Sequence, residues 1–280
     1  MRYTHGHGTA VLVSHSQRSA ADCAAYLLPH LQAGQDLLDV DCGPATITAD
    51  LAQAVAPGRT VGLDPAPAAL EAARATLAAR TALPGRRPRP GSAVDGAAPA
   101  VELVAGDVAS LPFEDGSFDV VHAHQVLQHV SDPVAALREM ARVARPGGLV
   151  AARDTVYPAM AWFPQPVPLE EWRRVYTATA RHNGGHPDAG ARLLSWCREA
   201  GLTQVECSAS TWCYATAPQR RQWGRTWAQR CLSSFGPQAV ELGLTTPEGL
   251  QEMAEAWHAW AEAGDGWFAV VHGEVLARPA

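Results

Sequence analysis

The sequence lacks any long apolar run, any signal-peptide pattern and any excess of positive charge. No apolar stretch approaches the ~20 residues that a membrane-spanning helix needs. The opening residues, MRYTHGHGTA, have no apolar core region. The formal net charge of -6 argues against a nucleic acid as partner. We therefore expect a cytoplasmic protein that binds neither a membrane nor a nucleic acid.

Cysteine pairs with metal-ligand spacing are also absent. The six cysteines form no CxxC pair, and they stand at positions 23, 42, 197, 207, 213 and 231. Scattered cysteines in a chain without a secretion signal are typical of reduced core thiols. His122, His124 and His129 are not expected to converge on a metal, because strand alternation and a turn separate them. We predict neither a disulfide framework nor a metal site.

The composition that is present fits a globular enzyme. Hydrophobic residues make up 47% of the 280 positions and charged residues 18%. This balance is that of a folded protein rather than of a disordered chain. The length suffices for one large α/β domain or two small ones, and we treat residues 1–280 as a single domain.

Apolar segments with strand patterns alternate with amphipathic segments along most of the chain. Seven segments have strand patterns, and they lie at 36–41, 59–65, 101–106, 118–124, 149–154, 203–216 and 266–278. Helical patterns follow several of them, at 44–55, 66–80, 132–144 and 186–202. This alternation predicts an α/β fold whose sheet is mostly parallel and is covered on both faces.

Two segments differ from this alternation by their position or composition. Residues 1–34 contain a helical pattern at 19–31 with Ser19 as its N-cap, and we expect them to form an N-terminal helical flap. Residues 81–100 are rich in Pro, Gly and Ala and have no periodicity, which predicts a flexible insertion.

Two further segments, 157–186 and 215–264, have helical patterns and are rich in Trp. Their Trp side chains can simply pack a core, since aromatic residues dominate core energetics. Alternatively, both segments form a helical cap over the carboxyl ends of the strands, where open α/β sheets bind their ligands.

The stretch LLDVDCGPATITADLA, at 37–52, combines a strand, a Gly-Pro turn and a helix. Such a turn lets a ligand approach the backbone and directs helix N–H groups at it. Asp64 ends the second strand, where an acid can accept hydrogen bonds from ribose hydroxyls. Asp107 follows the third strand, where its carboxylate can accept from an adenine amino group while the Val108 N–H donates. Three such signals at successive strand ends predict a nucleotide-like cofactor.

The run that carries these residues, from LLDVDCGP through VGLDPAPAALEAAR to GDVASLPFEDGSFDVVHAHQVLQHVSDP, resembles the class I S-adenosylmethionine-dependent methyltransferases. Within them it is most similar to the ubiquinone/menaquinone-methyltransferase-like small-molecule subgroup. The resemblance covers about residues 36–154 strongly and implies a Rossmann-like, seven-stranded sheet with a reversed last hairpin. It implies S-adenosylmethionine as cofactor and S-adenosylhomocysteine as product. The matching cofactor positions are Asp39, Gly43, Asp64, Pro65, Asp107, Val108, His124 and Gln125, with Tyr3 of the flap near the sulfonium.

The sequence departs from this family at Asp41 and Ala45, which replace two glycines of the loop. A side chain at a positive φ costs roughly 1 kcal/mol or more. The Asp41 carboxylate can either pair with the cofactor's ammonium group or repel its carboxylate. Ala45 is the milder change, because it adds one methyl group at a helix start. Gly43 is retained, and we expect cofactor binding to survive.

The reacting end of the site is predicted around three residues. Methyl transfer from a sulfonium needs a base only when the nucleophile carries a poorly acidic proton. His124 ends the fourth strand, beside the expected methyl group, and shares a strand face with His122. In natural-product sugar O-methyltransferases that resemble this stretch, a His matching His129 and an Asp matching Asp154 act near the nucleophile. We predict His129, Asp154 and His124 as catalytic residues, although His129 can also simply pack against the cap.

The sequence thus predicts methyl transfer from S-adenosylmethionine to a small-molecule acceptor in natural-product biosynthesis. The Trp-rich segments favour an aromatic or hydrophobic acceptor, and the chain is expected to be a monomer or homodimer. Asp41 and Ala45 motivate the alternative of a cyclase, isomerase or binding protein that keeps the methyltransferase fold but transfers no methyl group. A nicotinamide dehydrogenase is disfavoured, because a glycine turn alone does not specify the cofactor.

Overall fold

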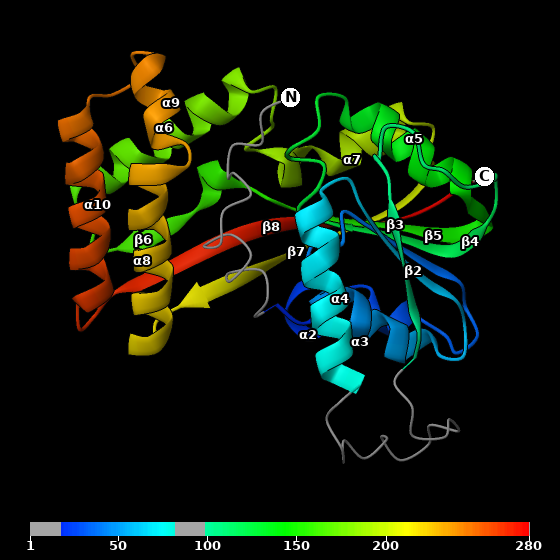
Figure 1. Cartoon of the computed structure of the whole chain (residues 1–280). Helices are drawn as coiled ribbons and strands as arrows, with labels where there is room; N and C mark the ends of the chain where they lie inside the picture. Colours follow the sequence, from blue (N-terminus) through cyan, green and yellow to red (C-terminus); the bar gives the residue numbers. More distant parts are fainter. Residues whose placement is uncertain (1–17, 82–98, 280) are drawn as a thin grey trace.

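The computed structural model describes residues 18–81 and 99–279 (Figure 1). Tyr3, half of the expected flap and most of the expected insertion lie outside these residues. One sheet runs through the described chain in the order β3-β2-β1-β4-β5-β8-β6, and β7 also pairs with β8. Its eight strands are β1 (Leu37–Val40), β2 (Thr60–Asp64), β3 (Val101–Ala105), β4 (Phe118–His124), β5 (Ala144–Thr155), β6 (Ala161–Phe163), β7 (Gln204–Tyr214) and β8 (Trp267–Arg278).

The strand directions confirm the predicted α/β sheet with a reversed last hairpin. The first five strands pair in parallel. β8 runs antiparallel to β5, and β7 runs antiparallel to β8. The short strand β6 was not expected, since the segment 157–186 was predicted to lie outside the sheet. It pairs with β8 through Trp162 and Phe268, and three residues flanked by prolines are too few to show a strand period.

Helices cover both faces of the sheet (Figure 1). One face carries α2 (Ala20–Cys23), α3 (Thr46–Val55) and α4 (Pro67–Thr81), and the other carries α5 (Pro133–Val143) and α7 (Ala189–Glu199). Each face therefore encloses its own apolar core, one built on α5 and α7 and the other on α2 and α3.

The N-terminal helix is much shorter than expected. Ser19 does cap α2, since its hydroxyl accepts from the Asp22 N–H at 3.2 Å. The helix nevertheless stops after Cys23, because Ala24 has a φ of -134°. A single 3-10 turn, η1 (Leu28–His30), follows it. The apolar pattern of this segment is satisfied by burial of Cys23 and Leu27 against the sheet rather than by a continuous helix.

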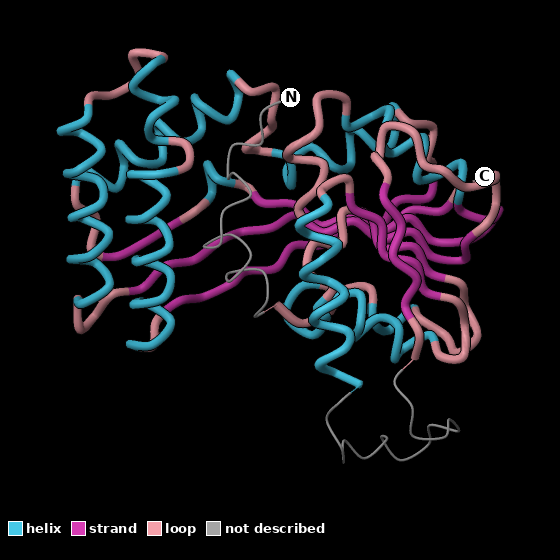
Figure 2. The backbone as a smooth tube through the Cα atoms, viewed as in Figure 1, coloured by secondary structure: helices cyan, strands magenta, loops and turns pink. Residues whose placement is uncertain are grey.

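The two Trp-rich segments pack together beyond the carboxyl end of β5, where β7 and β8 continue past the wide sheet (Figure 2). They contain the 3-10 turn η2 (Tyr157–Ala159) and the helices α6 (Val167–His182), α8 (Ala217–Ser233), α9 (Gly236–Glu241) and α10 (Pro247–Glu262). We call η2, β6 and these four helices the cap.

Trp side chains form the core of the cap. Trp172 lies with its ring centroid 4.6 Å from that of Trp227 and 4.8 Å from that of Trp257. A Cβ at Gly224 would come within 2.7 Å of the Trp257 carbonyl oxygen, so a glycine there lets α8 approach α10 closely. Most of the Trp content is thus used for packing, and it gives little information about the acceptor. No helix of the described chain is long and apolar enough to cross a membrane.

Candidate cofactor and acceptor site

The loop between β1 and α3 has the backbone that the cofactor turn requires. Asp41, Gly43 and Ala45 all adopt positive φ, at 50°, 55° and 56°. The two non-glycine residues are therefore held in a region that L-residues disfavour. The surrounding structure keeps the loop in its glycine-type conformation despite the two substitutions.

Asp64 at the end of β2 holds this loop in place. Its Oδ2 accepts a hydrogen bond from the Gly43 backbone N–H at 2.9 Å, and its Oδ1 accepts from the Ala66 N–H at 2.8 Å. The residue is buried. Each oxygen of a carboxylate can accept more than one hydrogen bond, so Asp64 still has capacity for ribose hydroxyls.

Asp39 is bonded to protein groups through both of its oxygens. Oδ1 lies 2.7 Å from Nδ1 of His122 on β4, and Oδ2 accepts from the Thr48 hydroxyl at 2.5 Å. These contacts join β1, β4 and α3 beneath the loop. They indicate that Asp39 positions the loop, whatever contact it makes with a cofactor.

The Asp41 side chain is in a different situation from Asp39. Its Oδ1 is buried and has no hydrogen-bond partner among the described residues. Burial, and then the negative charges of Asp64, Asp107 and Asp39, raise the pKa of Asp41 to about 8. The predicted cofactor acids are therefore gathered in one place, and Asp41 carries an oxygen that a cationic ligand group can use.

Asp107 lies in an exposed turn just after β3. Its Oδ1 accepts from the Ala109 N–H at 2.9 Å, and the neighbouring Val108 side chain is buried. Pro65, after β2, is exposed. The turn therefore presents a carboxylate next to a backbone that is anchored by an apolar side chain.

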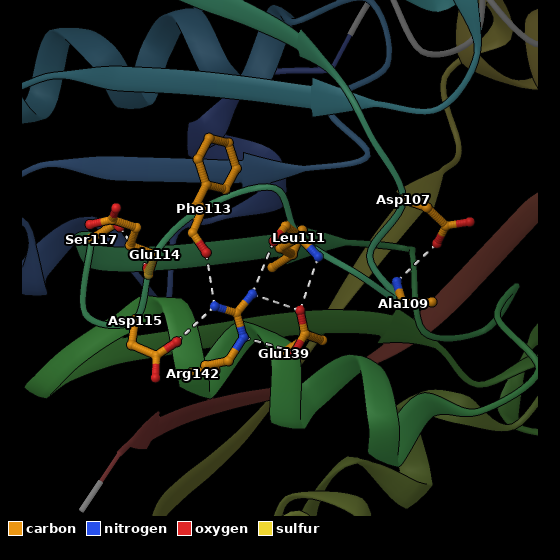
Figure 3. A network of polar contacts seen from close by, with 9 residues as sticks. All are labelled: Asp107, Ala109, Leu111, Phe113, Glu114, Asp115, Ser117, Glu139 and Arg142. Carbon is orange, nitrogen blue, oxygen red and sulfur yellow. Dashed lines mark hydrogen bonds and ion pairs between the residues drawn. The ribbon is translucent and has the colours of Figure 1, made fainter.

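Arg142 of α5 fixes the loop that carries Asp107 (Figure 3). Its guanidinium donates to the Leu111 and Phe113 carbonyl oxygens at 2.9 and 2.8 Å. It also pairs with Glu139 at 2.8 Å, and Glu139 in turn accepts from the Leu111 N–H. The residues between β3 and β4 are thereby clamped to α5.

Gln125 follows β4 with a φ of 58° and is held by side-chain contacts. Its Nε2 donates to the Thr155 hydroxyl at 2.8 Å and lies 3.0 Å from Nε2 of His272. Its Oε1 accepts from Arg18 at 2.9 Å. This amide thus links the ends of β4 and β5, and His272 within β8, to Arg18 of the N-terminal segment.

His124 and His122 do share one face of β4, as expected. His124 lies between Trp212 and His272, at ring-centroid distances of 5.8 and 6.4 Å. Both its ring nitrogens are buried without a hydrogen-bond partner in the described chain. Burial, followed by the charges of Arg18 and Arg153, lowers the pKa of His124 well below its usual value, so the ring is neutral at neutral pH.

His129 and Asp154 are both near the loop that follows β4. Nε2 of His129 lies 3.1 Å from the side-chain nitrogen of Gln128, and Asp154 Oδ1 accepts from the Gln128 N–H at 3.1 Å. Burial, and then Arg18 and Arg230, lower the pKa of His129 to about 3. Burial raises the pKa of Asp154 to about 8. At neutral pH, His129 is neutral and Asp154 is protonated.

Sequence reasoning did not anticipate a row of buried polar side chains across β5, β8 and β7. Arg153 Nε contacts Glu274 and Ser210, each at 3.1 Å. His272 lies with its ring centroid 4.4 Å from Trp212. The alternation of β8 could have indicated His272 and Glu274, because both fall on the inward face of a mostly apolar strand. No group of metal-ligating side chains was found in the described ranges.

Comparison with known proteins identifies the family of this chain. A model of the methyltransferase domain matches residues 38–152. An uncharacterised methyltransferase of Schizosaccharomyces pombe is 31% identical over 99% of this chain and 96% of its own length. A demethylmenaquinone methyltransferase of Staphylococcus epidermidis is 35% identical over 49% of each chain. The chain belongs to the class I S-adenosylmethionine-dependent methyltransferases.

One solved structure bears on the alternative chemistry. The 4+2 cyclase SpnF shares the fold with a TM-score of 0.50 and 20% identity, over 96% of this chain and 80% of that one. This likeness shows the common architecture alone. It does not transfer the cyclase activity, since one scaffold can carry unrelated chemistries.

Proposed function

We propose that this chain transfers a methyl group from S-adenosylmethionine to a small-molecule acceptor in specialised metabolism. The observation that carries the proposal is the group of three acids, Asp41, Asp64 and Asp107, at the ends of neighbouring parallel strands. The loop after β1 has the backbone conformation of the cofactor turn, and Asp41 contributes a buried oxygen without a hydrogen-bond partner in the described chain.

The residues present fit this cofactor. Asp64 and Asp107 are acceptors suited to the ribose hydroxyls and the adenine amino group. Asp41 is suited to the ammonium group of the methionine part, because three neighbouring carboxylates already disfavour a further negative charge there. We therefore propose that Asp41 pairs with the ammonium group rather than repelling the carboxylate of the cofactor. When bound, S-adenosylmethionine supplies a methyl group on a positively charged sulfur.

The acceptor is proposed to lie between the carboxyl ends of β4 and β5 and the cap. His129 stands at this junction, and its pKa responds to Arg230 of α8 as well as to Arg18. As a neutral imidazole it can take a proton from a hydroxyl nucleophile. Asp154 supports the loop of His129 through the Gln128 backbone, and His124 is the last residue of β4. Both are therefore proposed as further members of the site.

The test combines cofactor identification with product detection. The purified chain is analysed by mass spectrometry for retained S-adenosylmethionine or S-adenosylhomocysteine. It is then incubated with S-adenosylmethionine that carries a labelled methyl group and with candidate small-molecule acceptors. Label in an acceptor, with equimolar S-adenosylhomocysteine, supports the proposal. Conversion of an acceptor without label transfer instead supports the cyclase or isomerase alternative.

A further inference from the structure

Arg230 of α8 is a buried cation without an ionic partner in the described chain. Its exposed fraction is 5%, and its Nε has no hydrogen-bond partner. Among the ion pairs of residues 18–81 and 99–279, none includes Arg230. A charge removed from water without a partner strongly destabilises a fold, so this arrangement calls for an explanation.

Arg153 shows how the same chain neutralises a buried arginine that belongs to its architecture. Arg153 is 1% exposed, and its guanidinium contacts the Glu274 carboxylate and the Ser210 hydroxyl. Arg230 is buried to nearly the same degree, forms no ion pair with a described residue, and has its central carbon 4.9 Å from the centroid of the Trp227 ring. No residue of the described ranges thus supplies a counter-charge to Arg230.

The surroundings of Arg230 place it at the acceptor side of the proposed site. Trp227, beneath it, has its ring centroid 6.4 Å from that of Tyr157, which directly follows β5. The positive charge of Arg230 lowers the pKa of His129 and opposes the rise in the pKa of Tyr157 that burial causes. Arg18 donates a hydrogen bond to Gln125. Its charge also lowers the pKa of His129 and opposes the rise in the pKa of Tyr157.

The chemistry of this arrangement selects one kind of ligand group. A guanidinium offers paired N–H donors that match the two oxygens of a carboxylate or phosphate. The Trp face fixes the plane of the guanidinium, which reduces the ordering needed on binding.

We propose that the methyl acceptor carries an oxyanion group, a carboxylate or a phosphate, which pairs with Arg230 while the reacting atom faces His129. This inference rests on the proposed methyl transfer at the same site and adds the charge class of its substrate. Burial is the main cause of the low pKa of His129, and the charges of Arg18 and Arg230 lower it further. A bound anion would offset the contribution of these two charges.

The test compares matched probes in the presence of saturating S-adenosylhomocysteine. The probes are 4-hydroxybenzoate, 4-hydroxyphenyl phosphate and the neutral 4-hydroxybenzamide, and binding is followed by Trp fluorescence and calorimetry. We expect at least one anion to bind roughly tenfold or more tightly than the amide, the scale of one charge-assisted pair. The two anions distinguish a carboxylate from a phosphate. Equal binding of amide and anions, or no saturable binding of either anion, overturns the inference.

Two substitutions in α8 test whether Arg230 causes the preference for an anionic ligand. Arg230→Met should abolish the preference for the anion, whereas Arg225→Met, at an exposed position of the same helix, should preserve it. Without ligand, Arg230→Met should raise the melting temperature by roughly 2–4 °C, because it removes an unpaired buried charge. A preference that persists in Arg230→Met, or a fold that this variant weakens, contradicts the inference. Wild-type chain that binds no S-adenosylhomocysteine contradicts the proposed function instead.

Discussion

The Gly43 backbone N–H donates to Oδ2 of Asp64 at 2.9 Å, which joins the loop after β1 to the end of β2. The residue expected to hold the cofactor ribose therefore also holds the loop on which the methionine part would rest. Among the described residues, the hydrogen bond of the Asp107 carboxylate lies within its own exposed turn, to the Ala109 N–H. The two acids should respond differently to the same substitution.

Asp64→Ala and Asp107→Ala should each weaken S-adenosylhomocysteine binding by roughly 1–3 kcal/mol, the scale of lost hydrogen bonds to a charged group. Asp64→Ala should in addition lower the free energy of unfolding by about 1–2 kcal/mol, because two backbone N–H groups lose their acceptor. Calorimetry and denaturant unfolding measure the two effects. Glu114→Ala, at an exposed position near Asp107, is the control, and unchanged affinity in both Asp variants refutes the assignment.

The pH dependence of the protein's stability tests the raised pKa of Asp41. Its pKa rises from 3.8 to about 8 on folding, so the folded state holds a proton that the unfolded chain releases between these values. Stability from this group is present at low pH and is lost as the pH rises through about 8. Replacement of Asp41 by Asn should therefore stabilise the protein more at pH 8 and above than at low pH, as measured by melting temperature.

The pH dependence of cofactor affinity distinguishes the two possible roles of Asp41, which are attraction of the ammonium group and repulsion of the cofactor. If its carboxylate pairs with the ammonium group, wild-type affinity for S-adenosylhomocysteine should rise as the pH increases through about 8, because the ionised form predominates above that pH. Asp41→Asn should show a flat profile and weaker binding. An affinity that falls with pH in the wild type, and that improves in Asp41→Asn, would show that the carboxylate repels the cofactor.

Ala45 tests whether backbone strain in the loop has a function. At a φ of 56°, replacement by glycine should raise the free energy of unfolding by roughly 1 kcal/mol. Cofactor affinity should stay at least as high as in the wild type. Ala75→Gly, at an exposed position inside α4, should instead lower stability by about 1 kcal/mol. Loss of cofactor binding in Ala45→Gly would mean that the methyl group of Ala45 contacts the ligand.

For a hydroxyl nucleophile, His129→Ala and Asp154→Ala should each lower kcat by about 10²-fold or more, with cofactor affinity near wild type. Asp154→Asn separates two roles, because it keeps an oxygen acceptor for the Gln128 N–H. A loss of turnover in this variant assigns a proton-linked role to Asp154, and wild-type turnover assigns a positioning role. Full activity of both Ala variants would point to catalysis by proximity, as suits a thiolate or an enolate carbon.

The strands and turns that could be predicted from the sequence are those set by local chemistry. The helical pattern expected at 132–144 corresponds to α5, and Asp132 caps this helix by accepting from the Ala135 N–H at 2.9 Å. A positive φ at Asp41 and Ala45 followed from the turn that they occupy. By contrast, the expected helix at 19–31 ends after Cys23, because packing against the sheet overrides the local apolar pattern.

The contacts that could not be predicted join residues far apart in the chain. Arg153 and Glu274 are separated by 121 positions, and nothing local to either indicates the other. Trp227 in the cap core and Trp212 beside His124 have the same residue type, and only the packed structure separates the two roles. Arg230 lies in a helix with several arginines, and its significance comes from burial, which periodicity alone does not assign.

Calorimetric titration of the purified wild-type chain with S-adenosylhomocysteine, followed by mass spectrometry of acceptors incubated with S-adenosyl-[methyl-¹³C]methionine, tests the central claim most directly. We predict saturable binding at one site per chain and appearance of the label in an acceptor, at a rate that falls in Asp64→Ala. A wild-type chain that binds no S-adenosylhomocysteine, or that binds it and converts its acceptor without transfer of the labelled methyl group, would contradict the account.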